Sequence, residues 1–391
     1  MSPSGCLRRL AVACVLSCSV FEQGCAAPEP SARAPLPVKP VEVALTLPGS
    51  DAGAIDYAKL PKLSGVHAVV SGPDPVLKFQ LHSYLAFHDG LYWCMWSQGP
   101  PVEDEPTQQV RYATSEDGVH WSEARPLTGL PQSGYGYIAR GFWIREGKLL
   151  ALVAHYYGKG AFGAHKQLEL RAFQWDAGTT RWTPRGTLYE DAINNFPPEK
   201  LRTGEWMMSR RDSRFNVYML VGGVKALDDW DAIPVVRRLQ IPRFVPDEPI
   251  WWAQPDGTLV SLYRDNGGST WLFRSISRDN GRNWTTPVAT NFPNTPSKLF
   301  SLALDSGCRM LVSNANPGIG RREIFLSTSP DGWTFTRMAQ LAVPSARAAT
   351  LQYPHAIVHD GYVLITFSRA KASIEVLKIP EKDVRAMCEA H

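Results

Sequence analysis

The chain has 391 residues, of which 44% are hydrophobic and 20% are charged, so it can build a sizeable core and is not a disordered or fibrous chain. The net charge of +4 is dispersed without a long basic run, and we therefore expect no nucleic-acid partner. The 13 Trp and 31 Pro residues are typical of a turn-rich β protein with aromatic packing or sugar-stacking surfaces.

Residues 1–26 are typical of a signal peptide. The basic start MSPSGCLRR precedes the apolar stretch LAVACVLSCSVF, which is too short to span a membrane. Cleavage near Ala26–Ala27 would leave residues 27–60 as a Pro-rich spacer. We therefore expect a secreted or periplasmic protein. An alternative is a lipid anchor on Cys25 or Cys18 at the cell envelope, although neither position has a clean lipidation motif.

Four of the seven cysteines lie in this leader, so the body of the chain keeps only Cys94, Cys308 and Cys388. Their number is odd and no Cys-x-x-Cys pair occurs, so we expect neither a disulfide framework nor a zinc site. The stretch LYWCMWS predicts that Cys94 is a small, buried apolar residue.

One pattern recurs along the body of the chain: an apolar strand, a turn that contains Gly, and a second apolar strand. The turns, such as HDG, REG and PDG, suit hairpins because Gly tolerates positive φ. The strands are apolar on both faces, as expected for inner strands covered on both sides. The six repeats are spaced by about 45 to 65 residues, which is the period of a propeller with one four-stranded blade per repeat. They begin near residues 82, 141, 206, 250, 300 and 353.

We therefore predict one all-β domain over residues 61–385, a six-bladed β-propeller. A strand at residues 65–72 is expected to close the ring by pairing with the last blade, because closure removes exposed sheet edges. Seven blades are the alternative, if residues 41–75 form more than a closing strand.

A second motif, Ser-x-Asp with a following Gly and aromatic residue, occurs three times. It reads SEDGVHW at 115–121, SRDNGRNW at 277–284 and SPDGWTF at 329–335. The Asp carboxylate can accept hydrogen bonds from the N–H groups of the turn, and Gly permits the chain reversal. We expect the aromatic residue to pack between blades, so the motif predicts a structural role for Asp117, Asp279 and Asp331.

With these turns and repeats, residues 65–380 resemble the sialidase superfamily, whose "Asp box" is this turn and whose fold is a six-bladed propeller. The resemblance implies fold more directly than function. Sialidases hold the substrate carboxylate with three arginines, and they use a Tyr–Glu nucleophile pair and an Asp acid/base. At the place of their first arginine this chain has His82, in FQLHSYLAF. An imidazole cannot rebuild a bidentate clamp, so the resemblance favours a substrate other than sialic acid.

Other candidate residues stand where an inner strand begins or a second strand ends, and these places share one rim of a propeller. His82 and His355 are candidate acid–base groups, with hydrogen-bonded structural histidines as the alternative. Tyr353 is a candidate match for the sialidase nucleophile, and Glu248 a candidate acid or partner of that tyrosine. The candidate substrate-binding residues are Arg140, Arg210, Arg264, Arg369 and Trp251, with Arg211 as the alternative to Arg210. For Arg264 and Arg369 the alternative is an ion pair, for example with Asp265 or Glu375.

The expected function is an exported, sialidase-like exo-glycosidase that acts on terminal acidic or uronic-acid-linked sugars of an oligo- or polysaccharide. Two alternatives remain: a lyase on uronic-acid glycans, and a non-catalytic glycan-binding propeller. No phosphate-binding loop or metal-protease motif occurs, so we expect a monomer that needs no cofactor or metal.

Overall fold

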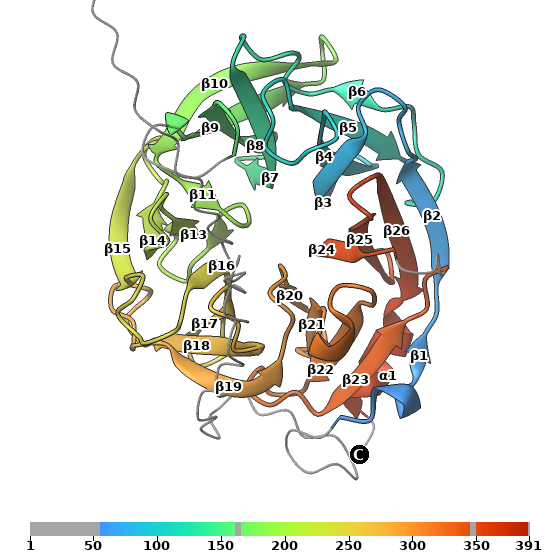
Figure 1. Cartoon of the computed structure of the whole chain (residues 1–391), viewed down its shortest axis with the longest axis vertical. Helices are drawn as coiled ribbons and strands as arrows, with labels where there is room; N and C mark the ends of the chain where they lie inside the picture. The colour runs from blue at the N-terminus through green and yellow to red at the C-terminus, as the bar shows by residue number, and fades with distance from the viewer. Residues whose placement is uncertain (1–54, 161–165, 345–348, 390–391) are drawn as a thin grey trace, which may run out of the picture. The chain divides into compact units, whose positions relative to one another are not determined.

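The computed structural model describes residues 55–160, 166–344 and 349–389, and the predicted signal peptide and lipid-anchor cysteines lie outside them. Within this part of the chain, six β-sheets stand around a central axis as the blades of a propeller (Figure 1). The predicted six-bladed all-β fold is thus confirmed. None of the described helices is long and apolar enough to cross a membrane.

The first three blades follow one another along the chain. Blade 1 contains β3 (Phe79–His88), β4 (Leu91–Gly99), β5 (Gln109–Ser115) and β6 (Arg125–Pro126). Blade 2 contains β7 (Tyr135–Arg145), β8 (Lys148–Tyr157), β9 (Glu169–Asp176) and β10 (Arg181–Glu190). Blade 3 contains β11 (Ile193–Asn194), β12 (Glu199–Lys200), β13 (Trp206–Arg211), β14 (Val217–Gly222) and β15 (Trp230–Val236).

The other three blades complete the ring. Blade 4 contains β16 (Pro246–Ala253), β17 (Leu259–Asp265), β18 (Trp271–Ser277) and β19 (Val288–Pro293). Blade 5 contains β20 (Phe300–Ala303), β21 (Arg309–Ser313), β22 (Phe325–Ser329) and β23 (Arg337–Leu341), and β1 (Lys62–Leu63) adds to its outer edge. Blade 6 contains β24 (Leu351–His359), β25 (Tyr362–Arg369), β26 (Ser373–Pro380) and β2 (Val66–Ser71).

The ring closes as predicted, because the N-terminal strand β2 completes the last blade. It pairs antiparallel with β26, with Val66 opposite Lys378 and Ala68 opposite Val376. A short segment before it also contacts the ring: the Tyr57 hydroxyl in the 3-10 turn η1 (Tyr57–Lys59) donates a 2.6 Å hydrogen bond to the Ala315 carbonyl. Both contacts tie the N-terminal segment to the C-terminal half of the ring.

Blade 3 departs from the predicted repeat. We assigned the strand near residue 206 as an inner strand, but β13 is the second strand of its blade. The innermost position is filled by two short pieces, β11 and β12, which pair with opposite ends of β13. Phe196, Pro197 and Pro198 interrupt this edge, and neither proline can donate a ladder hydrogen bond. Because the inner strand is divided into two short pieces, the repeat pattern of the sequence did not predict it.

The core of the described residues lies mainly in six larger apolar clusters, one between each pair of neighbouring blades, and two smaller clusters add to the contacts between blades 2 and 3 and between blades 6 and 1. Tyr84, Trp93 and Leu149 belong to the cluster between blades 1 and 2, for example. The Asp boxes support these interfaces from the ends of the third strands. At the first box, the Asp117 carboxylate accepts hydrogen bonds from the N–H groups of Val119 and His120, both at 2.8 Å. The aromatic residues that follow the boxes, Trp121, Trp284 and Phe335, pack into clusters shared with the preceding blade.

The C-terminus carries the one α-helix of the described residues, α1 (Glu381–Glu389). Its Val384 is buried against blades 5 and 6. A disulfide between Cys308 in blade 5 and Cys388 in the helix joins the two, with a Cα–Cα distance of 6.1 Å. Our expectation of no disulfide was wrong, because the count and spacing of cysteines did not reveal a pair 80 residues apart. Cys94 is free and buried, as predicted.

Candidate active site

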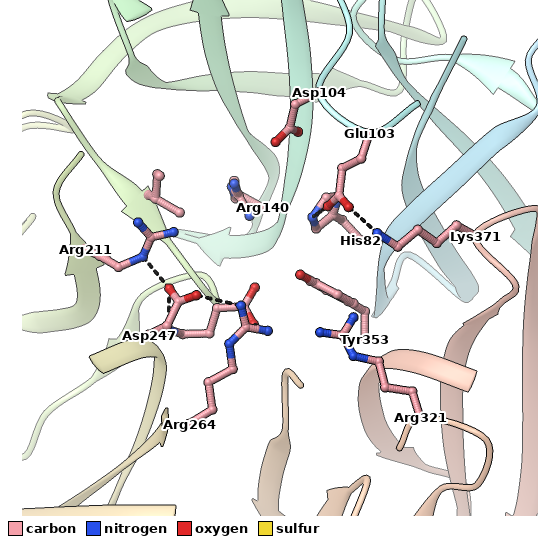
Figure 2. Close-up of a pocket in the computed structure, with 12 residues that line it drawn as sticks. His82, Glu103, Asp104, Arg140, Arg211, Asp247, Arg264, Arg321, Tyr353 and Lys371 are labelled. Carbon is pink, nitrogen blue, oxygen red and sulfur yellow. Dashed lines mark hydrogen bonds and ion pairs between the residues drawn. The ribbon is translucent and has the colours of Figure 1, made fainter. Parts of the chain in front are cut away.

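A pocket of about 370 Å³ lies where the rims of the inner strands meet. Side chains from all six blades line it: His82, Glu103, Asp104, Arg140, Ile193, Arg211, Asp247, Glu248, Arg264, Arg321, Tyr353 and Lys371 (Figure 2). The Asp boxes follow the third strand of their blades, at the ends of the strands away from the pocket. The site is therefore separated from the hairpins that hold the blades together.

A β-bulge aims side chains into the pocket from each of four inner strands. The pairing register shifts after Leu81 in β3, Ala139 in β7, Asp247 in β16 and Gln352 in β24. An extra residue at a bulge leaves the ladder and redirects its side chain. The residues that follow these shifts are His82, Arg140, Glu248 and Tyr353.

Three of these bulged residues have a backbone conformation that is costly for a side chain. His82, Glu248 and Tyr353 have φ values of 56°, 41° and 57°. Non-glycine residues rarely occupy the left-handed region, and such strain gathers at functional sites where the surrounding structure enforces it. At the fourth bulge Gly141 has φ 109°, and a Cβ there would lie 2.6 Å from Pro197, so only glycine fits behind Arg140.

A buried chain of alternating charges forms one wall of the pocket. Asp247 pairs with Arg211 and, at 2.6 Å, with Arg264; Arg264 in turn pairs with Glu248 at 2.5 Å. Burial raises the pKa of Asp247, but the two guanidinium groups outweigh it and hold that pKa at about 2. The carboxylate is therefore charged, and the network fixes Glu248 at the edge of the cavity.

Tyr353 points its hydroxyl toward the middle of the pocket (Figure 2). Its ring meets the His82 ring edge to face, with centroids 4.8 Å apart. Burial and then the Glu248 charge raise the pKa of Tyr353 well above its usual value, while Arg264 and Arg321 act in the opposite direction. The phenol is thus protonated at neutral pH, with a carboxylate close enough to act on it electrostatically.

His82 is buried and belongs to a second polar group. Its Nδ1 lies 3.2 Å from Ser97 Oγ, which accepts a 2.9 Å hydrogen bond from the Ala139 N–H. The Ser97 hydroxyl is then free to donate to Nδ1, which places the ring proton on Nε2, 3.6 Å from Glu103. Burial and the nearby cations, Arg140 first, lower the pKa of His82 well below 6.5. The imidazole is therefore neutral at neutral pH.

The loop between β4 and β5 brings two carboxylates, those of Glu103 and Asp104, over the pocket. Contacts to blade 2 hold this loop. The Asp104 carbonyl accepts a 2.8 Å hydrogen bond from the Gly160 N–H, and the Glu105 carbonyl accepts one of 2.8 Å from the Tyr156 hydroxyl. Lys371 of blade 6 forms an ion pair with Glu103 from the other side. Both carboxylates are thus fixed at the pocket instead of extending into solvent.

Two arginines of the pocket have no carboxylate partner among the described residues. Arg140 is 4% exposed, and its Nε has no hydrogen-bond acceptor in this part of the chain. Arg321 donates to two neutral acceptors, Gln352 Oε1 and the Pro296 carbonyl, both at 2.5 Å. Their charges are therefore left for a ligand to balance.

Below the pocket, the buried Lys298 packs on aromatic rings. Its Nζ donates a 2.7 Å hydrogen bond to the Tyr84 hydroxyl and lies 4.1 Å from the centre of that ring. The Tyr84 hydroxyl donates to the Asn195 carbonyl at 2.7 Å, and Asn195 Nδ2 donates to the Glu248 carbonyl at 3.0 Å. Burial lowers the pKa of Lys298 well below its usual range. This chain of contacts supports the bulge that presents Glu248.

Five of the nine predicted site residues line the pocket: His82, Arg140, Glu248, Arg264 and Tyr353. His355 does not, because it is buried among aromatic rings and its Nδ1 accepts a 3.1 Å hydrogen bond from the Leu85 N–H. It tethers the neighbouring inner strand, which was the structural alternative considered for it.

The other three predicted residues are also outside the pocket. Arg210 stacks on Tyr189 and Tyr218, and its neighbour Arg211 enters the pocket instead, because alternate residues of a strand face opposite sides. Arg369 is held by Glu375 at 2.7 Å, the ion pair considered as its alternative. Trp251 is 9% exposed and packs in the cluster between blades 3 and 4.

Sequence reasoning missed five charged residues of the pocket: Glu103, Asp104, Asp247, Arg321 and Lys371. Arg211 was predicted only as the alternative to Arg210. A topological signal existed for four of the five missed residues. The loop from the second to the third strand of each blade returns to the pocket rim. Such loops carry Glu103 and Asp104 in PVEDEP, Arg321 in GIGRREI and Lys371 in RAKAS. Asp247 and Arg211 needed the correct strand assignments in blades 3 and 4.

The fold is a six-bladed β-propeller with Asp boxes, which is similar to the fold of solved sialidases. The BNR repeat-like domain family matches residues 229–365, which include the second and third Asp boxes. No curated protein matches the chain significantly. These findings confirm the resemblance to the sialidase superfamily in its fold and its BNR repeat.

Solved structures share the propeller at low sequence identity. A Dyadobacter fermentans protein of unknown function has a TM-score of 0.64 and 16% identity, over 82% of this chain and all of that one. A sialidase has a TM-score of 0.60 and 17% identity, over 86% of this chain and 35% of that one. Trypanosoma rangeli sialidase in complex with sialic acid has a TM-score of 0.58 and 12% identity, over 89% of this chain and 61% of that one. This chain thus spans about a third to three fifths of those two sialidases, and the likeness concerns the fold.

Proposed function

We propose that the protein is an exported exo-glycosidase of sialidase-like type that removes a terminal acidic sugar. The observation that carries the proposal is Tyr353, a buried phenol that a strained bulge holds in the pocket within the electrostatic influence of Glu248 and Arg264. A buried tyrosine beside a carboxylate is an activated nucleophile, because the carboxylate can accept the phenol proton as the oxygen attacks.

The proposed reaction uses residues from opposite sides of the pocket. Tyr353 Oη attacks the anomeric carbon while its proton passes to Glu248. The glycosidic bond breaks as the carboxyl group of Asp104 in the β4–β5 loop gives its proton to the leaving oxygen. Water then attacks the covalent sugar–tyrosine intermediate, the loop carboxylate takes the proton from the water, and Glu248 returns a proton to the phenol. Two displacements at one carbon retain its configuration.

Two further features support the substrate and the location. Arg140 and Arg321 offer charges without a carboxylate partner to an anionic sugar, and arginine suits such groups because its fork can bind carboxylate bidentately. The disulfide between Cys308 and Cys388 is typical of oxidising compartments, which supports export.

The test is turnover of aryl glycosides by the mature protein and by Tyr353→Phe. We screen neutral sugars, uronic acids and sialic acid, each linked to a chromogenic leaving group. We expect release from at least one acidic glycoside, and loss of at least about 100-fold in kcat for Tyr353→Phe, since a nucleophile has no substitute in the pocket. Tyr218→Phe is the matched control, because Tyr218 lies in β14 outside the pocket and contacts Arg210.

The same assays distinguish the alternatives. A lyase product would absorb ultraviolet light through a new double bond, whereas a hydrolase product would not. Binding of acidic sugars without release of any product would favour a glycan-binding propeller. Full activity of Tyr353→Phe would exclude Tyr353 as the nucleophile and with it the proposed mechanism.

A further inference from the structure

We propose that the substrate sugar carries two anionic groups, a carboxylate and a second oxyanion such as a sulfate ester or another carboxylate, and that Arg140 and Arg321 each bind one of them. The inference rests on the proposed function, since it concerns the same pocket, and it specifies the class of acidic sugar.

The ion pairs within the pocket limit which of its cations can bind an anion of the substrate. Three of its five Lys and Arg side chains are already neutralised by the protein: Arg211 and Arg264 by Asp247 and Glu248, and Lys371 by Glu103. A carboxylate of the substrate gains little from cations that are already paired. The cations that remain for it, among the described residues, are Arg140 and Arg321.

Arg140 is the stronger of the two signals. A guanidinium that is 4% exposed and has no paired carboxylate among the described residues is costly, because a buried charge needs compensation. Its charge already acts on its neighbours, since it adds to the effect of burial in lowering the pKa of Lys298 and of His82. A β-bulge holds Arg140 in this position, and the bulge requires Gly141, which a larger residue could not replace. A bound anion would provide the missing compensation.

Arg321 is a separate site and not a second arm of the same clamp. In Figure 2 the side chains of Arg140 and Arg321 enter from opposite sides of the pocket, with Tyr353 between them. Arg321 is positioned by Gln352 and by the Pro296 carbonyl, and it acts on the phenol of Tyr353. A single carboxylate cannot bridge two cations on opposite sides of a sugar ring, so a ligand that satisfies both must carry two anions.

The neutral His82 separates this arrangement from a sialidase clamp. His82 occupies the place of the first sialidase arginine, and Arg264, on the adjacent wall, is held by two carboxylates. The free positive charge lies instead one blade away, at Arg140 of blade 2. The pocket therefore offers an anion site at a position where the sialidase resemblance does not predict one.

The experiment compares sugars with zero, one and two anionic groups. The probes are aryl glucosides, aryl glucuronides and aryl glucuronides that carry one sulfate at each free ring hydroxyl in turn, with the unlinked sugars as ligands for calorimetric titration. We expect kcat/KM and affinity to rise at each step, and at least one sulfated glucuronide to exceed the unsulfated one by about 10-fold or more, the usual value of a charge-assisted contact.

Substitutions then assign each anion. Arg140→Gln should remove the preference for one anion and Arg321→Gln the preference for the other, while Arg210→Gln, which removes the same charge outside the pocket, should leave both preferences unchanged. Arg140→Lys keeps the charge and should retain part of the preference even if Arg140→Gln folds poorly.

Failure of this inference is distinguishable from failure of the proposed function. Turnover of a singly charged glycoside with no gain for any sulfated form, or equal losses on all probes for Arg140→Gln, would overturn the two-anion site and leave the glycosidase in place. Tight binding of a doubly charged sugar that depends on Arg140 but gives no product would retain the two-anion site and overturn the enzyme.

Discussion

Loss of the disulfide between Cys308 and Cys388 should lower the melting temperature by about 6 °C. The bond closes a loop of 80 residues that includes the whole of blade 6 apart from β2. In the chain-entropy account such a loop contributes about 4.5 kcal/mol by restricting the unfolded chain. At about 2 cal/mol/K per residue, the unfolding entropy of a ring of about 335 residues is close to 0.7 kcal/mol/K. Dividing the lost free energy by this entropy gives the shift in melting temperature.

The assay is calorimetry of the protein with Cys308 and Cys388 both replaced by Ser, with and without reductant. The melting temperature of the wild-type protein should fall by about 6 °C in reductant. Reductant should not lower the melting temperature of the double variant. Thiol titration of the denatured, unreduced mature chain should find one free cysteine, Cys94. Three free thiols, or a wild-type melting temperature that reductant leaves unchanged, would refute the reasoning.

Two further predictions concern carboxylates with different roles. Asp279→Ala should lower the stability by an amount near the lower end of about 1–3 kcal/mol and leave kcat unchanged, because it removes acceptors from the Asn283 N–H and Nδ2 while water can reach the site. Asp247→Asn should cost about 3–5 kcal/mol at pH 7, because it leaves Arg211 and Arg264 buried without their shared carboxylate. Since the pKa of Asp247 is lowered to about 2 in the folded protein, its stabilisation should be complete above about pH 4 and should disappear as the pH falls toward 2.

Thermal unfolding at several pH values checks both. A stable Asp279→Ala protein with abolished turnover would contradict a structural role for the box. An Asp247→Asn protein as stable as the wild type at pH 7 would show that the charge network does not hold the wall of the pocket. Asp331→Ala, in another Asp box, is the matched control for the first variant, because its carboxylate also accepts hydrogen bonds within its own turn, from the N–H groups of Trp333 and Thr334.

The repeat pattern predicted the ring well because a propeller repeats local features. Hairpin turns with Gly and two-sided apolar strands are visible in single segments, and the closing strand at 65–72 followed from the need to cover an edge. Blade 3 was misassigned because its inner strand is broken at Pro197 and Pro198, which left no apolar run to read. The disulfide was missed because two lone cysteines 80 residues apart carry no local signal.

The pocket was only partly predictable, because its side chains are aimed by β-bulges. A bulge shifts by one residue which side chains of a strand face each side of the sheet, and no single residue type predicts a bulge. Arg210 and Arg211 show the consequence, since the choice between neighbouring residues depends on strand register. Arg369 has the expected place at a strand end, yet Glu375 on the adjacent strand neutralises it, and that pairing exists only once β25 and β26 are aligned.

The bulges also explain how one propeller rim can change its substrate. His82 and Arg140 lie on neighbouring inner strands, and Ser97 Oγ contacts both strands, since it lies 3.2 Å from His82 Nδ1 and accepts a hydrogen bond from the N–H of Ala139, the residue before Arg140. A neutral imidazole at the first position leaves the cation at the second as the nearest unpaired charge. Under the proposed function, a histidine at the place of the first sialidase arginine, together with an arginine in the bulge one blade away, would move the anion site without any change in fold. The strained bulges at His82, Glu248 and Tyr353 hold these side chains in the pocket. In this proposal the specificity depends on the charge pattern of the pocket and not on the propeller fold itself.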